Sequence, residues 1–121
     1  SQRVADIVAA LRAKPGAILV ASGDAALAGA LAAAVETPRL AILDVQGFDT
    51  SGDEAFLERL YIPGLRRAGD LQTASEIAQG RLVIHNAGPQ FTASGARVQR
   101  PRLTPAQVRE LVRQATSASA R

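Results

Sequence analysis

The chain has 121 residues, of which 47% are hydrophobic and 21% are charged, and its formal net charge at pH 7 is +3. This composition is that of one folded globular domain rather than a disordered chain, and the lack of cysteine excludes disulfides, thiolate nucleophiles and thiolate metal sites. Aromatic residues make up only 3% of the chain, its arginines are dispersed, and it has no apolar run of membrane-spanning length, so neither a nucleic acid nor a membrane is expected as a partner.

The first predicted elements are a helix and a buried strand. Over residues 2–13, apolar side chains recur at the spacing of one helix face, namely Val4, Ile7, Val8 and Leu11. Pro15-Gly16 ends this helix. The run at 17–21 is apolar at every position, which is typical of a central strand in a parallel sheet.

A polar turn, Ser22-Gly23-Asp24, joins this strand to a helix rich in alanine and leucine that ends at Thr37-Pro38. We expect Asp24 to cap this helix. Its apolar stripe is predicted to hold Leu27, Leu31 and Val35. Because α/β enzymes place a nucleophile or a phosphate on such a strand–turn–helix unit, the turn is the first candidate site.

Two more buried strands are predicted further along the chain. The first covers 40–43 and ends at Asp44, and the second covers 82–84 and leads to His85-Asn86. Between these strands, Ser51-x-x-Glu54 predicts a helix over about 53–61, and Thr73-x-x-Glu76 predicts another that stops at Gly80.

The last part of the chain is predicted to be irregular and then helical. Residues 87–102 are rich in Gly, Pro and Arg, with a short edge strand near 96–99. Thr104-Pro105-x-Gln107 combines a capping box with a proline at the first helical position. The helix that follows presents Val108, Leu111, Val112 and Ala115 on one face, and residues 116–121 are expected to fray.

This alternation predicts an α/β, three-layer fold with a small, mostly parallel sheet of three to four strands and about five helices, in a single domain covering 1–121. Right-handed crossovers between sequential strands place their helices on one face of the sheet, and only the last helix can cross to the other. Much of one apolar face would then be open. We expect the remainder of a longer parent protein, or a second copy, to cover it.

Three segments carry a resemblance to a known family. They are residues 3–7 (RVADI), 43–49 (LDVQGFD) and 61–71 (YIPGLRRAGDL), the last two similar to a DxxGFD and a (F/Y)(L/I)PG…GDL signature. On these residues the chain resembles the C-terminal half of an α/β-hydrolase of the dienelactone-hydrolase/acetyl-xylan-esterase-like group found in environmental bacteria. The resemblance implies half of an α/β-hydrolase fold, with the rest of the sheet lying elsewhere or missing.

The turn is then tested as a nucleophile elbow, which needs small residues two positions before and after the nucleophile. If Ser22 were the nucleophile, these positions would hold Val20 and Asp24, which are both too large. The turn fits only with Gly23 at its tip, where no side chain is available to attack.

The resemblance also implies an acid after the third strand and a histidine before the last helix. No Asp or Glu occurs between Glu76 and Glu110, and the only histidine of the chain is His85. The catalytic positions are therefore predicted to be degenerate, with no catalytic residue assigned.

One alternative triad remains, namely Ser22, Asp44 or Asp49, and His85. Two strand spacings would separate Ser22 from His85 by roughly 10 Å, whereas proton transfer needs about 2.6–3.2 Å. The competing hypothesis is that His85 is a structural residue bonded locally at its strand end.

Weaker patterns add little. Asp49 begins a sequence like a calcium loop, but the twelfth position holds Leu60 instead of a bidentate glutamate. Neither G-x-G-x-x-G nor a Walker sequence is present, and no metal or cofactor is predicted. The arginines at 97, 100 and 102 are predicted to lie in a solvated loop, with a carboxylate-binding or interface role as the alternative.

The sequence thus predicts a non-catalytic α/β-hydrolase-like domain that serves as a structural, dimerisation or ligand-binding module. The candidate binding residues around the turn are Ser22, Gly23, Asp24 and His85. The alternative is an esterase-type hydrolase completed by another segment or subunit, and a third hypothesis is a flavodoxin-like binding domain that uses the turn at 22–25. The sequence does not indicate a compartment.

Overall fold

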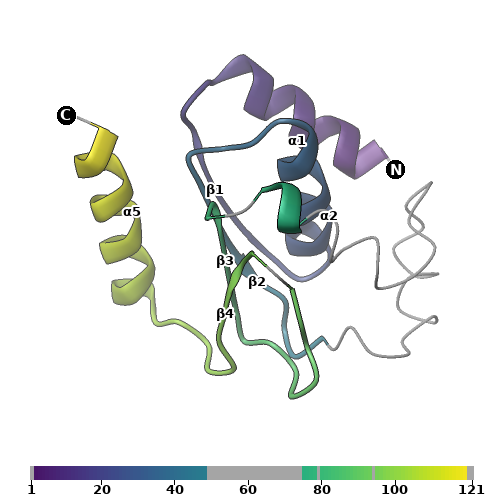
Figure 1. Ribbon diagram of the computed structural model, residues 1–121, viewed down its shortest axis with the longest axis vertical. Helices are drawn as coiled ribbons and strands as arrows, with labels where there is room; N and C mark the ends of the chain where they lie inside the picture. Colours follow the sequence, from purple (N-terminus) through teal and green to yellow (C-terminus); the bar gives the residue numbers. More distant parts are fainter. Residues whose placement is uncertain (1, 49–74, 79, 94, 120–121) are drawn as a thin grey trace.

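A four-stranded, all-parallel sheet forms the centre of the computed structural model (Figure 1). The structure describes residues 2–48, 75–78, 80–93 and 95–119. The strands follow one another across the sheet in chain order, as β1 (Ile18–Ser22), β2 (Leu40–Asp44), β3 (Leu82–His85) and β4 (Arg97–Val98). This confirms the predicted α/β fold and its short fourth strand. β1 begins and ends one residue later than predicted, so that Ser22 belongs to the strand.

Helices cover both faces of the sheet. Helix α2 (Asp24–Val35) and a helical turn at 75–77 lie on one face, whereas α5 (Pro105–Ser119) lies on the other (Figure 1). Helix α1 (Gln2–Ala13) packs against α2. The arrangement follows from the sequential strand order, because right-handed crossovers keep their helices on one side and leave only the last helix free to cross. The helix predicted near 53–61 falls outside the described residues.

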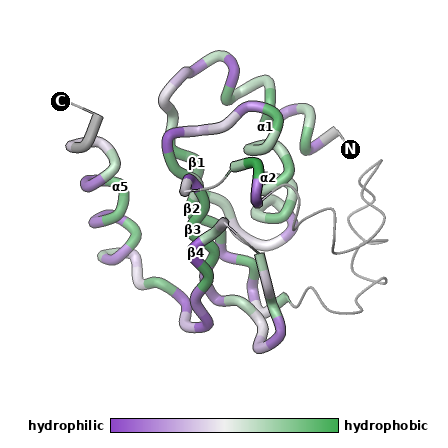
Figure 2. Tube along the Cα trace, in the orientation of Figure 1, coloured by the Kyte–Doolittle hydropathy of each residue, from purple (hydrophilic) through white to green (hydrophobic). Residues whose placement is uncertain are grey.

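The main hydrophobic core lies between the sheet and α2 (Figure 2). It is built mainly of small and branched aliphatic side chains, together with Phe48 and Phe91, whose rings meet edge to face with centroids 6.1 Å apart. The strand residues that face this core are Leu19, Ala21, Ala41, Leu43, Leu82, Ile84 and Val98. Successive side chains of a strand point to opposite faces, so the residues between them face α5.

Helix α2 differs from its predicted single stripe. Leu27 is buried, but Leu31 is only half-buried and Val35 is 62% exposed. Seven residues from Ala26 to Ala33 are buried instead, because a helix of such small residues can pack closely on more than one side. At Gly29 an added Cβ would lie 3.0 Å from Leu19 Cδ2, which shows how near the helix approaches β1.

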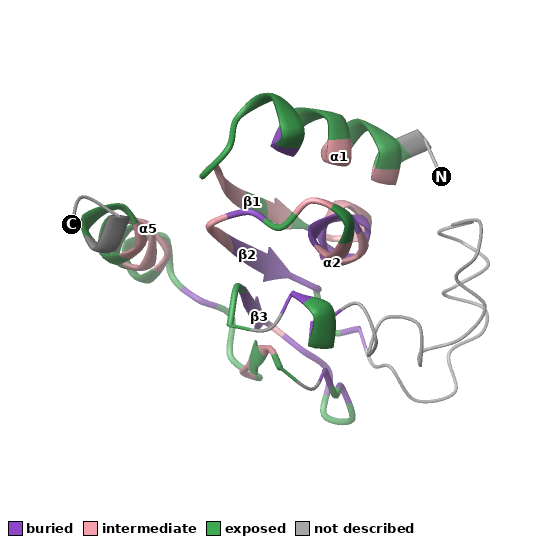
Figure 3. Ribbon diagram, turned by 45° about the horizontal axis from the view of Figure 1, so that its top comes forward, coloured by how far each residue is buried: buried purple, intermediate pink, exposed green. Residues whose placement is uncertain are grey.

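The predicted apolar faces of the other two helices are confirmed. In α1, Val4, Ile7 and Val8 are half-buried and Leu11 is buried, whereas the residues between them are exposed. In α5, the four predicted positions are the half-buried ones, namely Val108, Leu111, Val112 and Ala115 (Figure 3). Helix α5 continues to Ser119, where the sequence predicted a frayed tail from 116.

Helix α5 covers only part of its face of the sheet. Val108, Leu111 and Val112 pack around Leu40, Ile42 and Val83 of β2 and β3. On β1, Val20 stays 55% exposed. An open part of one apolar sheet face was predicted, and it lies over β1. Within the described residues, no helix combines the length and the apolar character needed to cross a membrane.

Candidate functional site

Three polar side chains form a row across the carboxyl edge of the sheet. Ser22 pairs in register with Asp44, and Asp44 pairs with His85, each as the last residue of its strand. Residues paired in register share a face of the sheet. Ile42 and Val83 lie two positions before Asp44 and His85 on the same strands, so they point to the same face, and they contact α5 side chains. All three side chains therefore point to the α5 side of the sheet.

The row forms one side of a pocket of about 420 Å³. The opposite side comes from the segment that leads into α5 and from the first turns of that helix. The complete lining is Val20, Ala21, Ser22, Asp44, His85, Arg102, Leu103, Pro105, Val108 and Arg109. Ligands of open α/β sheets bind in this location, outside the carboxyl ends of the strands.

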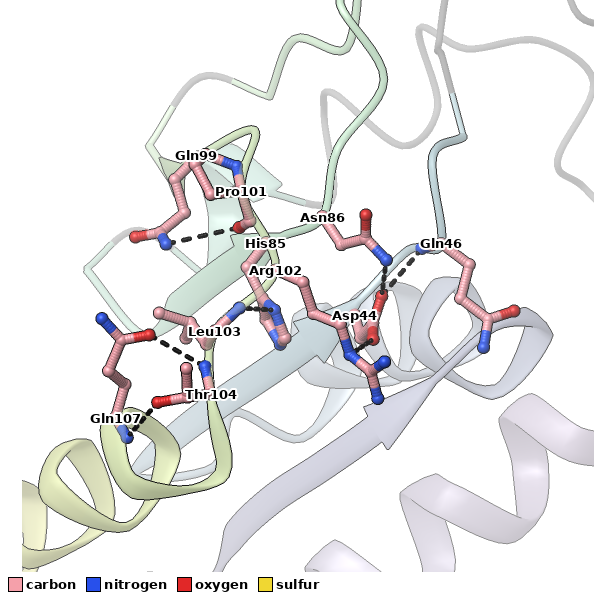
Figure 4. A network of polar contacts seen from close by, with 10 residues as sticks. All are labelled: Asp44, Gln46, His85, Asn86, Gln99, Pro101, Arg102, Leu103, Thr104 and Gln107. Atoms are coloured by element: carbon pink, nitrogen blue, oxygen red, sulfur yellow. Dashed lines mark hydrogen bonds and ion pairs between the residues drawn. The ribbon is translucent and has the colours of Figure 1, made fainter.

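Asp44 is the buried charge of this site. Its Oδ1 accepts hydrogen bonds from the Gln46 backbone N–H and from Asn86 Nδ2, both at 2.9 Å (Figure 4). Its Oδ2 lies 3.3 Å from Arg102 Nε in an ion pair whose aspartate side chain is 8% exposed and whose arginine is 75% exposed. The carboxylate is thus held by three partners, as a buried charge requires.

The two residues that bond Oδ1 have left-handed backbone conformations. Gln46 has a φ of 52° and Asn86 a φ of 54°, in a region that Asn adopts readily but Gln rarely does. The bond from the Gln46 N–H to Asp44 closes an Asx turn, which stabilises this conformation. Backbone strain of this kind is concentrated at binding and catalytic sites.

Backbone hydrogen bonds place Arg102 and Leu103 at the pocket. The Gln99 N–H donates to the Ile84 carbonyl at 2.9 Å, and the Asn86 N–H donates to the Pro101 carbonyl at 3.2 Å. These bonds keep the chain beside β3 after β4 ends. Helix α5 then begins with the predicted capping box, in which the Gln107 N–H donates to Thr104 Oγ1 and the Thr104 N–H donates to Gln107 Oε1 (Figure 4).

His85 is 5% exposed, and its Nδ1 accepts a hydrogen bond from the Leu103 backbone N–H at 3.0 Å (Figure 4). A ring nitrogen that accepts carries no proton, so the neutral imidazole holds its proton on Nε2. Burial lowers the pKa of His85 below 6.5, against the opposing effect of Asp44 and with a further lowering by Arg102. The ring is therefore neutral at pH 7.

The Nε2–H of His85 faces the pocket. Within the described residues, no buried side-chain nitrogen or oxygen lacks a hydrogen-bond partner. Among the described residues, the His85 side chain makes one hydrogen bond, at Nδ1, so Nε2 must be reached by solvent, and the pocket is the space that His85 lines. The ring offers this space a hydrogen-bond donor.

The turn after β1 corrects one prediction. Gly23, not Asp24, is the N-cap of α2, and it makes no side-chain capping bond because it has no side chain. Its φ of 64° and ψ of −136° lie near a region that is essentially restricted to glycine. The Gly23 N–H donates to the Asp44 carbonyl at 2.8 Å, and an added Cβ would lie 3.1 Å from Gln46 Oε1.

The structure brings together only some of the candidate residues. Ser22 and His85 line the same pocket on opposite sides of β2, whereas Gly23 and Asp24 are not part of its lining. Asp49 falls outside the described residues. A carboxylate-binding role was the alternative prediction for Arg102, but the sequence identified neither Asp44 as its partner nor Arg109 as part of the lining. One local signal in the sequence was an aspartate directly after a buried strand, because Asp44 can accept from the backbone N–H two residues later and form an Asx turn.

Across the described parts of the chain, no group of three or more His, Asp or Glu side chains could hold a metal ion. Comparisons of the chain with protein-family models, curated proteins and solved structures give no match. The α/β-hydrolase resemblance therefore stays a prediction. Of the three segments that carry it, 61–71 lies outside the described residues.

Proposed function

We propose that this chain is a non-catalytic, small-molecule-binding domain of α/β-hydrolase type. The observation that carries the proposal is the hydrogen bond from the Leu103 N–H to His85 Nδ1 at 3.0 Å. In a Ser-His-Asp triad the histidine accepts the serine proton at Nε2 and donates its Nδ1–H to the acid. His85 carries its proton on the opposite nitrogen, so its Nε2 is a donor and not a base.

The positions of the other groups support the same proposal. Ser22 and His85 are separated by the intervening strand β2, which corresponds to roughly 10 Å between their backbones. Both oxygens of Asp44 already have partners from its own chain. The elbow-like turn has glycine at its tip, flanked by Ala21 and Ala25, which supports a shape retained without a nucleophile.

Binding is supported by the pocket itself. Its volume of about 420 Å³ lies within the range of small-molecule sites, and it is an open depression in which apolar side chains lie beside a few polar groups. The hydrogen bonds from Gln46 and Asn86 hold Asp44 at its edge. These features together favour a rigid binding site over a reacting one.

Turnover of short p-nitrophenyl esters, measured beside ligand screening, tests the proposal. We expect no turnover above buffer for either the chain or Ser22→Ala, and we expect small fragments to shift backbone NMR signals of pocket residues. Turnover that Ser22→Ala abolishes would instead support the alternative, an esterase-type hydrolase completed by another segment or subunit. If no fragment shifts the NMR signals of the pocket residues, the binding function is contradicted.

We further propose that the open sheet face over β1 is covered in the complete protein, either by the remainder of a longer chain or by a second copy. The 55% exposure of Val20 supports this, because its neighbours across the same face are covered by α5. Within the described residues β1 is an edge strand, and it contains no proline or charged residue that would discourage further pairing, which also supports a neighbour on this side.

A further inference from the structure

We propose that the pocket binds a small organic carboxylate, which accepts hydrogen bonds from His85 Nε2–H and the Arg109 guanidinium while its apolar body lies against Leu103, Pro105 and Val108. The inference rests on the proposed ligand-binding function and adds the chemical class of the ligand. Three independent observations carry it, namely the hydrogen-bonding character of the pocket, its charge and its apolar wall.

The polar groups that face the pocket are mainly donors. His85 presents Nε2–H, because its acceptor nitrogen is occupied by the Leu103 N–H. Arg102 and Arg109 have only donors. Asp44 is the one carboxylate of the lining, and both of its oxygens have partners from the chain. Beside the Ser22 hydroxyl and the Asp44 carboxylate, the lining therefore offers a ligand mainly donors, which favours a ligand that supplies acceptors.

The charge of the lining also favours an anion. Asp44 and Arg102 form an ion pair and compensate each other. The Arg109 side chain has no hydrogen bond or ion pair within the described residues, so one positive charge of the lining has no counterion among them. The pocket also lies beside Pro105, the first residue of the 15-residue helix α5, where the helix dipole adds positive potential.

An apolar body distinguishes the ligand from a bare inorganic anion. Leu103, Pro105 and Val108 supply the apolar wall. A hydrocarbon group that lies on this wall removes apolar surface from water. A pocket of about 420 Å³ exceeds what one phosphate or sulfate needs, so a carboxylate with a short hydrocarbon group uses both parts of the site.

Two histidine variants separate recognition from structure. In His85→Asn, the amide oxygen occupies the position of Nδ1 and still accepts from the Leu103 N–H, but the Nε2 donor is lost. In His85→Gln, the amide nitrogen takes the position of Nε2 and keeps the donor, while the Nδ1 acceptor is lost. Carboxylate binding should weaken about tenfold or more in His85→Asn and should be better preserved in His85→Gln.

Two arginine variants on α5 give a matched pair. Arg109→Gln removes the uncompensated charge and should weaken binding about tenfold. Arg113→Gln removes the same charge one turn further along the helix, from a residue that pairs with Glu110 and does not line the pocket. It should change the dissociation constant less than about twofold.

The experiment is an NMR titration of the whole chain with butyrate, butyramide, butylamine and inorganic phosphate. We expect butyrate alone to shift the signals of Leu103 and its neighbours, with the variant pattern given above. Butyramide binding as tightly as butyrate, or phosphate binding as tightly, would overturn the ligand class but leave the binding function intact. No shift with any compound would contradict both. Since Arg109 is exposed, Arg109→Gln keeps the test valid if a His85 variant fails to fold.

Discussion

At the scale of single residues, Asp44 connects three segments that are distant in the sequence. Its carboxylate bonds Gln46 after β2, Asn86 after β3 and Arg102 before α5. Two of these partners are hydrogen-bond donors whose backbone is held at positive φ. The bonds to Oδ1 therefore stabilise the carboxyl edge of the sheet more than the exposed ion pair does.

Two replacements of Asp44 test whether the bonds to Oδ1 contribute more to stability than the ion pair with Arg102. Asp44→Ala should lower the free energy of unfolding by about 2–4 kcal/mol, because it leaves two donors without an acceptor at a buried position. Asp44→Asn keeps the amide oxygen for both donors and loses mainly the ion pair with exposed Arg102, so about 1 kcal/mol or less is expected. Urea unfolding measures both values. Equal losses in the two variants would show that the charge, not the Oδ1 bonds, dominates.

His85 makes the stability of the fold depend on pH. Its pKa in the folded chain lies below the ordinary value of 6.5, because burial and Arg102 disfavour the charged ring more than Asp44 favours it. As the pH falls through 6.5, the unfolded chain therefore takes up a proton that the folded chain does not. Stability should be fully present above this pH and should decrease below it.

Urea midpoints measured from about pH 7.5 down to 5.5 check this expectation. In His85→Asn the decrease should be smaller than in the unmodified chain, because the titrating ring is gone while the bond to Leu103 is kept. Parallel curves for the two proteins would show that groups other than His85 cause the pH dependence.

At the scale of elements, the turn between β1 and α2 depends on the absence of a side chain at Gly23. Gly23→Ala places a Cβ 3.1 Å from Gln46 Oε1 and forces alanine to a φ of 64°. We expect a loss of about 1–3 kcal/mol in the free energy of unfolding. Gly47→Ala is the matched control, since Gly47 has a φ of 80° but no atom within 4 Å of the added Cβ. If both variants lose the same amount, the contact with Gln46 is unimportant.

The elements themselves were largely predictable from local patterns. The apolar spacing of α1 and α5 and the capping box at Thr104 each determine a structure within a few residues of the chain. In α2 the same reasoning failed, because it gave weight to Leu31 and Val35, whereas the buried surface is made mainly of alanine. Alanine carries little periodic signal, although it decides how closely the helix packs.

The candidate site was predictable only in part, for a related physical reason. The carboxyl ends of parallel strands meet at one edge, so Ser22, Asp44 and His85 could be expected near one another. The tautomer of His85 and the partner of Asp44 depend on the path of residues 99–103, which backbone bonds to β3 determine. No pattern within that segment indicates this path.

At the scale of the whole molecule, α5 covers β2 and β3 but leaves Val20 on β1 exposed at 55%. We expect the 121-residue chain to self-associate through this face, which light scattering after size exclusion can measure. Val20→Lys should shift the association equilibrium towards the monomer. Val35→Lys, at a position that is 62% exposed on α2, should not. A monomeric unmodified chain would contradict a second copy as the cover.

The partial burial of α5 also has a consequence for local unfolding. Its contacts with the sheet come from Val108, Leu111 and Val112, which are only half-buried, whereas Ile42 and Leu43 of β2 are 0% exposed. Opening free energy follows the amount of buried apolar contact, so the amides of α5 should exchange with deuterium well before those of β2. A molecule held between the sheet and Arg109 would have to leave before α5 could open, and its presence should therefore slow exchange along the helix.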